Sequence, residues 1–144
     1  MKRELDEKLV KEFPLLYADR NASIRETAMC WGFECGDGWF DIIWDLSSKI
    51  EPLIQAYIDD NDNALCKSSH PRASQVKEKF GGLRFYMTDC TDEMRSLIDH
   101  TEDLSYSTCE TCGQPGTVRR TGWISILCDA CNEKKTAVKI ISKD

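Results

Sequence analysis

Two cysteine pairs near the C-terminal end constrain this chain more than any other feature. Each pair has the C-x-x-C spacing, Cys109 with Cys112 and Cys128 with Cys131, and fifteen residues separate the pairs. Two residues between cysteines let one tight turn direct both sulfurs at the same ion, and four thiolates are a usual ligand set of a structural zinc site. The sequence therefore predicts one structural zinc ion held by these four cysteines.

The segments around the second pair predict how such a site would be built. Residues 117–127, between the pairs, alternate in polarity and carry Thr121-Gly122 at their centre, which predicts a β-hairpin. Residues 132–141, after the second pair, are compatible with a helix. A hairpin between two cysteine turns is typical of a zinc ribbon, and the following helix also fits a treble clef, so both arrangements stay open.

Composition and charge exclude several classes of protein. The chain has 144 residues, a net charge of -6 and no apolar run near the ~20 residues of a membrane span. Its first eight residues lack the apolar core of a secretory signal, so we expect a soluble intracellular protein. In a reducing cytosol, eight cysteines indicate metal ligands or buried thiols rather than disulfides.

Charge is unevenly divided along the chain. Residues 1–104 hold 13 basic and 21 acidic side chains, whereas residues 105–144 hold six basic and four acidic ones. Such an acidic first part disfavours non-specific attachment to DNA or to an anionic membrane, because both depend on summed basic charge. We therefore expect no membrane partner and do not favour nucleic acid.

The periodicity predicts an α+β fold, with residues 1–104 as a helical and β-hairpin body. One helix begins near Glu4 and is ended by Pro14, and a second follows Asp37, its expected cap, with an apolar stripe that Pro52 should kink or divide. A third, capped by Asp89 or Thr91, leads to the cysteines. Residues 105–144 form the zinc-ribbon or treble-clef module, expected to pack on the body as one cooperative unit.

The segment 76–87 predicts a hairpin that carries a basic face. With Gly81-Gly82 as its two-residue turn, Phe80 lies opposite Leu83 and Lys79 opposite Arg84. Four side chains share the outer face: Lys77, Lys79, Arg84 and Tyr86. Two interpretations stay open, a solvated face neutralised by nearby acids, and a site for phosphate, a nucleotide or an acidic partner surface.

Three weaker candidate sites remain. Trp31 and Trp39 lie in a glycine-rich loop that can meet a partner. A second basic-aromatic patch, open to nucleic acid or to an ordinary surface role, comprises Arg119, Arg120 and Trp123. The spacing within Cys30, Cys35, Cys66 and His70 suits a second metal site, although free cysteines are more often buried apolar side chains.

Residues for catalysis are scarce. His70 and His100 are the only histidines, and no nucleophile-elbow or phosphate-loop motif is present. We therefore expect a non-enzymatic protein and place a small hydrolase or nuclease around His70 last.

Three motifs in combination resemble a group of small uncharacterised proteins of bacteriophages and prophages. They are Glu34-Cys-Gly-Asp-Gly-Trp-Phe40, Val76-Lys-Glu-Lys-Phe-Gly-Gly-Leu-Arg-Phe-Tyr86, and the two cysteine pairs with Gly122-Trp123 between them. The resemblance implies a phage accessory protein acting in the host cytoplasm, where it would bind a host protein or sequester a small anionic, nucleotide-like ligand to counter host defence. Self-association is left open.

A weaker resemblance is to regulators of RNA polymerase that place two C-x-x-C pairs after a helical segment. Those regulators depend on a long helical hairpin, which Pro14 and Pro52 argue against here. Because the cysteine pairs match but the helical hairpin does not, a nucleic-acid-binding or polymerase-associated regulator is kept only as the alternative function.

Overall fold

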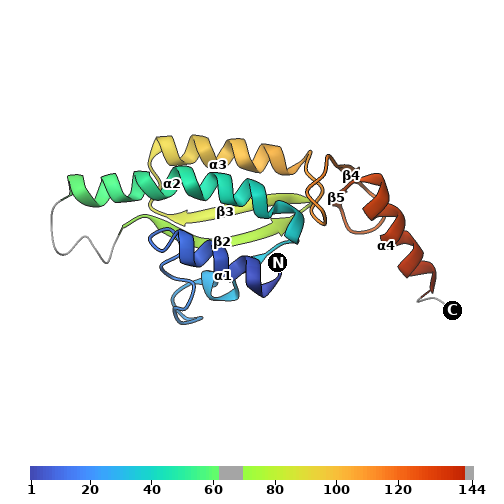
Figure 1. The fold of residues 1–144 in the computed structure, drawn as a ribbon, viewed down its shortest axis with the longest axis horizontal. Coiled ribbons are helices and arrows are strands. Elements are labelled where there is room, and N and C mark those ends of the chain that lie inside the picture. Colours follow the sequence, from blue (N-terminus) through green and yellow to red (C-terminus); the bar gives the residue numbers. More distant parts are fainter. Residues whose placement is uncertain (62–69, 142–144) are drawn as a thin grey trace.

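The computed structural model describes residues 1–61 and 70–141, which form a mixed α+β fold, as predicted (Figure 1). In chain order the elements are α1 (Arg3–Glu12), η1 (Ala28–Trp31), β1 (Phe33–Glu34), η2 (Asp37–Trp39), α2 (Phe40–Asp60), β2 (Arg72–Lys79), β3 (Gly82–Thr88), α3 (Asp92–Ser105), β4 (Thr117–Arg119), β5 (Ser125–Leu127) and α4 (Asp129–Ile141), where η marks a 3-10 turn.

The first two helices follow the predicted apolar patterns, with two differences. Pro52 lies inside α2 without dividing it. The side of the helix that carries Pro52 is exposed, so water can bond the backbone carbonyl that proline leaves without a partner. Asp37 does not cap α2. Instead its carboxylate accepts a hydrogen bond of 2.7 Å from the backbone N–H of Lys2, at the start of α1.

The body sheet has three strands in the order β1-β2-β3. β1 runs parallel to β2, with Phe33 opposite Val76, and β2 runs antiparallel to β3, with Val76 opposite Phe85. These three side chains are buried on the inner face of the sheet. The sheet therefore has one face in the core and one outer face that carries polar side chains.

The predicted turn of the β2–β3 hairpin is wrong by one residue. The turn residues are Phe80 and Gly81, both with positive φ (53° and 88°), and Gly82 is the first residue of β3, opposite Lys79. A Cβ atom on Gly82 would overlap the ring of Tyr106, so this glycine is needed in the strand. As a result Phe80 is 70% exposed rather than on the inner face, and Lys77 rather than Lys79 lies opposite Arg84.

The third helix closes the outer edge of β3. Of the two predicted caps, Asp89 and Thr91, it is Thr91 that caps α3. Its side chain accepts a hydrogen bond from the N–H of Met94. Near its other end, the hydroxyl of Ser105 accepts from the N–H of Leu83 at 2.9 Å and the carboxylate of Glu102 accepts from Phe85 at 2.9 Å. These side chains take the place of a fourth strand, which protects an otherwise open edge.

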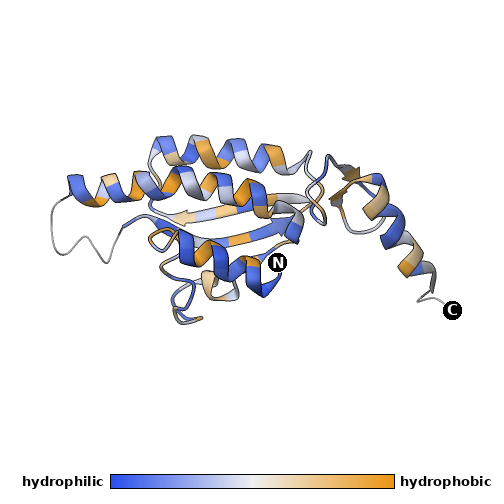
Figure 2. Ribbon diagram, in the orientation of Figure 1, coloured by the Kyte–Doolittle hydropathy of each residue, from blue (hydrophilic) through white to orange (hydrophobic). Residues whose placement is uncertain are grey.

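The core lies between the sheet and the helices. α2 and α3 run side by side along the β2–β3 hairpin, and each helix of the body shows apolar and hydrophilic residues in alternating bands (Figures 1 and 2). The largest fully buried side chains are Trp39, Tyr17, Phe85, Leu9, Leu16, Met29, Ile43, Leu46, Ile50, Ile54, Leu83 and Met94.

Residues 108–141, here called the cysteine module, lie at one end of the body, and α4 points away from it (Figure 1). The β4–β5 hairpin and the helix after it form as predicted, and Gly122 takes a positive φ of 84° in the hairpin turn. No helix in the described part of the chain is long and apolar enough to cross a bilayer.

Candidate metal centre

Four cysteine sulfurs gather in the cysteine module. The Sγ atoms of Cys109, Cys112, Cys128 and Cys131 all lie within 4.8 Å of one another, and those of Cys112 and Cys128 are 3.6 Å apart. A tetrahedral ion with metal–sulfur bonds of about 2.3 Å places its sulfurs about 3.8 Å apart. The four side chains can therefore hold one metal ion.

Local backbone geometry explains how each sulfur reaches the cluster. Gly113 closes the first cysteine turn at φ 81°, with its N–H donating to the carbonyl of Cys109 at 2.9 Å. Cys128 directly follows β5, and Cys131 lies in the first turn of α4, where its N–H points at the Cys128 sulfur at 3.4 Å. The hairpin between the pairs thus brings two distant turns to the same point.

The protonation of each thiol in the cluster depends on its neighbours. Burial raises the pKa of Cys109, but hydrogen bonds from backbone N–H groups, among them those of Cys112 and Thr111, lower it by more, so that the pKa is about 7. The neighbouring sulfur of Cys128 raises the pKa of Cys131 to about 12. A cation at the centre would stabilise all four thiolates at once, which is the chemistry of a closed structural site.

The first cysteine turn packs directly on the body. Gly38 donates its N–H to the carbonyl of Glu110 at 2.8 Å, and a Cβ atom on Gly38 would overlap the carbonyl of Cys109 and lie 2.7 Å from the N of Cys112. Only glycine fits this contact. The cysteine turn therefore packs against the glycine-rich stretch before α2 that the sequence singled out.

Two further hydrogen bonds hold the same contact. The carboxylate of Glu110 accepts from the N–H of Gly36 at 3.0 Å, and the indole N–H of Trp39 donates to the carbonyl of Thr108 at 2.9 Å. Trp39 is fully buried, so the prediction that it meets a partner is wrong. Trp31, its companion in that prediction, is 61% exposed on η1.

The predicted second metal site is not assembled by the described residues. Cys30, Cys35 and His70 do not belong to any cluster of ligand side chains found among them, and Cys66 lies outside the described residues. Burial raises the pKa of the Cys35 thiol to about 12, which keeps it protonated. The buried His70 ring instead donates from Nε2 to the carbonyl of Leu15 at 2.8 Å.

The outer face of the sheet brings together the basic side chains that the sequence predicted there. Lys77 lies between Glu34 on β1 and Arg84 on β3, so it has an acid on one side and a second cation on the other. The Arg84 guanidinium donates to the carbonyl of Leu83 and to the hydroxyl of Tyr106. Lys77 and Lys79 extend over the rings of Tyr86 and Phe80, at 6.0 and 5.6 Å. Among the described residues no ion pair joins Lys77, Lys79 or Arg84 to a carboxylate, so both interpretations of this face stay predictions.

The second basic-aromatic patch differs in its side chains from the one that the sequence predicted. Arg119 donates to the carbonyl of Leu127 and to the carboxylate of Asp129 at 2.7 Å, so it ties β4 to the start of α4. Arg120 is exposed, and Trp123 is 72% exposed at the hairpin turn. The sequence reasoning missed three lysines of α4 on this side, Lys134, Lys135 and Lys139. The available signal was the i, i+4 spacing of Lys135 and Lys139, with Lys134 beside Lys135.

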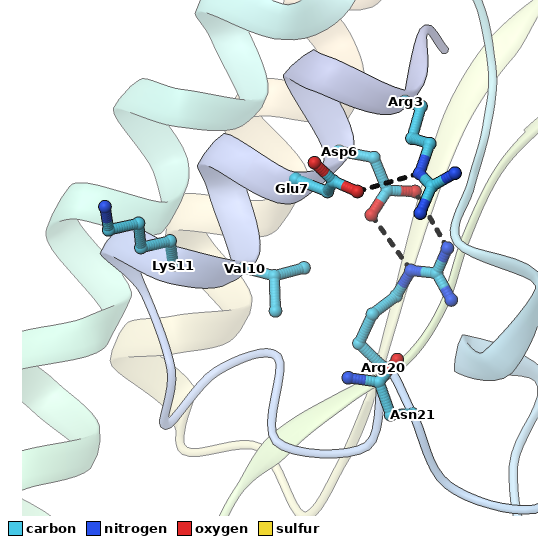
Figure 3. Close-up of a pocket in the computed structure, with 7 residues that line it drawn as sticks. All are labelled: Arg3, Asp6, Glu7, Val10, Lys11, Arg20 and Asn21. Carbon is cyan, nitrogen blue, oxygen red and sulfur yellow. Dashed lines mark hydrogen bonds and ion pairs between the residues drawn. The ribbon is translucent and has the colours of Figure 1, made fainter.

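A cavity of about 470 Å³ lies beside α1 (Figure 3). Its most prominent feature is the ion pair of Asp6 and Arg20, with Nε to Oδ1 at 2.9 Å and Nη2 to Oδ2 at 3.2 Å. The same guanidinium donates to the carbonyl of Cys30 at 2.8 Å. Because its charges are paired with one another, this ion pair connects α1 to the loop before β1 rather than presenting an unsatisfied charge to a ligand.

No protein-family model, curated protein or solved structure matches this chain. The resemblance to phage proteins, and the origin it implies, therefore stay predictions.

Proposed function

We propose that this chain is a non-enzymatic binding protein of the phage accessory type, in which a structural zinc ion holds a docking surface for a host protein. Zinc is the metal that four thiolates in tetrahedral arrangement most often bind in closed structural sites. The order of cysteine turn, hairpin and helix that carries the last ligand suggests a treble clef rather than a ribbon.

The observation that carries this proposal is a group of exposed apolar side chains beside the metal centre, the end patch: Phe80, Trp123 and Val138. Their exposed fractions are 70%, 72% and 65%. Gly81, next to Phe80, has its backbone against the side chain of Ile124, next to Trp123, so the two hairpin turns meet. Exposed large apolar groups that cluster in this way mark interaction surfaces.

The surroundings of the end patch favour a protein partner with an apolar pocket and acidic edges. Trp123 and Val138 line an open groove of about 590 Å³ between the body and the cysteine module. Lys134 and Lys139 line the α4 side of this groove, whereas Glu78 and Glu110 also line it, and Lys79 lies beside Phe80. The basic groups on the α4 side and beside Phe80 suit acidic groups of a partner at those places, which would guide association.

The metal identity is tested by native and denaturing mass spectrometry of reduced, untagged protein. One zinc per chain that is lost under denaturing conditions supports the proposal. A full-length, folded protein that carries no metal would contradict it.

The docking surface is tested by affinity capture from a bacterial extract with zinc-loaded protein, comparing Trp123→Ala with Trp31→Ala. Both variants remove one exposed tryptophan, but only the first changes the end patch. We expect a specific host protein to be lost with Trp123→Ala and kept with Trp31→Ala. Equal capture by the two variants would contradict the proposal.

The alternative, a nucleic-acid or polymerase-associated regulator, is favoured by one observation. Trp123 lies among cationic side chains, with Arg120 on its own hairpin and three lysines on α4. Aromatic and basic groups side by side can stack a base and neutralise phosphate. Capture that is abolished by nuclease and falls steeply with salt would select this alternative.

A further inference from the structure

A second hollow of the cysteine module lies between its hairpin and α4, and it shares Ser125, Lys135 and Lys139 with the groove beneath the end patch. This cleft has a volume of about 270 Å³ and is lined by Arg119, Thr121, Ser125, Asn132, Lys135, Thr136 and Lys139. Among the described residues no carboxylate lines it. In a chain with a net charge of -6, a concave site with three cations and no lining acid is unusual.

The helix turns an unexpected side toward the hairpin. Asn132, Lys135 and Lys139 recur every three to four residues, which places them on one side of α4 above the hairpin, while Val138 is exposed. A helix that serves only to cover a hairpin would present its apolar residues there. The polar side therefore leaves a hollow of hydrogen-bonding groups where packing would be expected.

Hydrogen bonds hold two cations, Lys135 and Arg119, at the walls of the cleft. The Lys135 ammonium donates to the Ser125 hydroxyl at 3.3 Å, and that of Lys139 lies 3.7 Å from the Cβ position of Gly122 at the hairpin turn. Arg119 is held by Asp129, which offsets part of its charge. Two ammonium groups from the helix thus face a hairpin wall that offers the hydroxyls of Thr121 and Ser125.

We propose that this cleft binds a phosphate group, carried either by a free nucleotide or by the backbone of a single-stranded nucleic acid. A phosphate accepts several hydrogen bonds and prefers charged donors. Lysine ammonium and arginine guanidinium groups supply charged donors here, and hydroxyl and amide groups add neutral ones. The volume is below the roughly 300–1,000 Å³ of pockets that enclose a whole drug-sized ligand, so the cleft suits the phosphate and its ester linkage. The cleft shares Lys135 and Lys139 with the groove of the docking surface, but phosphate binding here does not require a host protein.

The test titrates zinc-loaded protein with two probes, adenosine monophosphate and a short oligothymidylate, followed by NMR chemical shifts and calorimetry. Lys135→Gln removes one cleft cation and keeps a group able to donate to Ser125. Lys134→Gln is the matched control, because it makes the same change on the next residue of α4, outside the cleft. Zinc content and melting temperature establish that both variants are folded.

We expect Lys135→Gln to weaken binding about tenfold, the loss of one charged hydrogen bond, with Lys134→Gln close to the parent. Dependence on Lys135 with the mononucleotide assigns the site to free nucleotides, and dependence with the oligonucleotide alone assigns it to a nucleic-acid backbone. The proposal is overturned if neither probe binds at millimolar concentration, or if the two variants weaken binding equally. Trp123→Ala should leave mononucleotide binding intact, so failure here is separable from failure of the docking proposal.

Discussion

Gly38→Ala is the sharpest test of how the metal centre is attached to the body. The new methyl group would overlap the Cys109 carbonyl and lie 2.6 Å from the N of Gly113. These neighbours are backbone atoms of a turn fixed by hydrogen bonds, so they cannot move as the end of a flexible side chain would. The methyl group must therefore push the cysteine turn away from the body.

The magnitude follows from two contributions. Overpacking a tight contact costs about 1–3 kcal/mol, and separating Gly38 from Glu110 loses a hydrogen bond of 2.8 Å that is worth about 1 kcal/mol. We expect a loss of about 2–4 kcal/mol in unfolding free energy. At roughly 4 °C per kcal/mol for a chain of this size, the melting temperature should fall by roughly 8–16 °C.

The assay combines thermal unfolding of zinc-loaded protein with competition against a chelator. Gly122→Ala is the control. Among the described residues its Cβ atom would meet only the Lys139 ammonium, at 3.7 Å, so its cost of about 1–2 kcal/mol comes from the positive φ. Gly38→Ala should release zinc more readily, whereas Gly122→Ala should not. A melting temperature of Gly38→Ala within about 2 °C of the parent would refute the packing described for the cysteine turn.

Three further predictions concern the metal, the sheet edge and pH. Zinc removal by a chelator should unfold the cysteine module and change the fluorescence of Trp39, whose indole is bonded to Thr108; unchanged fluorescence and hydrogen exchange would contradict this. Glu102→Ala should cost about 1–3 kcal/mol in urea unfolding, because the buried N–H of Phe85 loses its partner, while the exposed Asp103→Ala should cost little. Burial raises the pKa of Glu51 above 4.5, so the folded state binds its proton more tightly than the unfolded state. The stability of the parent relative to Glu51→Gln should therefore fall as pH rises from 4.5 through the raised pKa. A rise in this relative stability would contradict the assignment.

Local patterns in the sequence were sufficient for the elements whose causes are local. Pro14 ends α1, Thr91 caps α3, and Gly122 sits in the hairpin turn between the cysteine pairs, all as predicted. The C-x-x-C spacing likewise predicted which four sulfurs come together, because two residues fix the geometry of each turn.

Tertiary contacts decided the features that local patterns misplaced. Two glycines in succession, Gly81 and Gly82, make either a plausible turn residue, and only the ring of Tyr106, from beyond α3, requires Gly82 in the strand. Asp37 has the chemistry of a helix cap, but the N–H of Lys2 reaches it from the start of the chain. In each case the deciding partner lies more than twenty residues away in sequence.

The sequence by itself determined the helices, the hairpins and the four cysteines of this protein that can hold a metal ion. Only the tertiary structure showed that Trp39 is buried under the cysteine turn, that Trp123 is exposed, and that Lys135 and Lys139 face a hollow. The reason is physical: hydrophobicity and spacing describe which side of an element a residue occupies, whereas exposure depends on what packs there. For this chain the body covers one side of the cysteine module and leaves the side with Trp123 open.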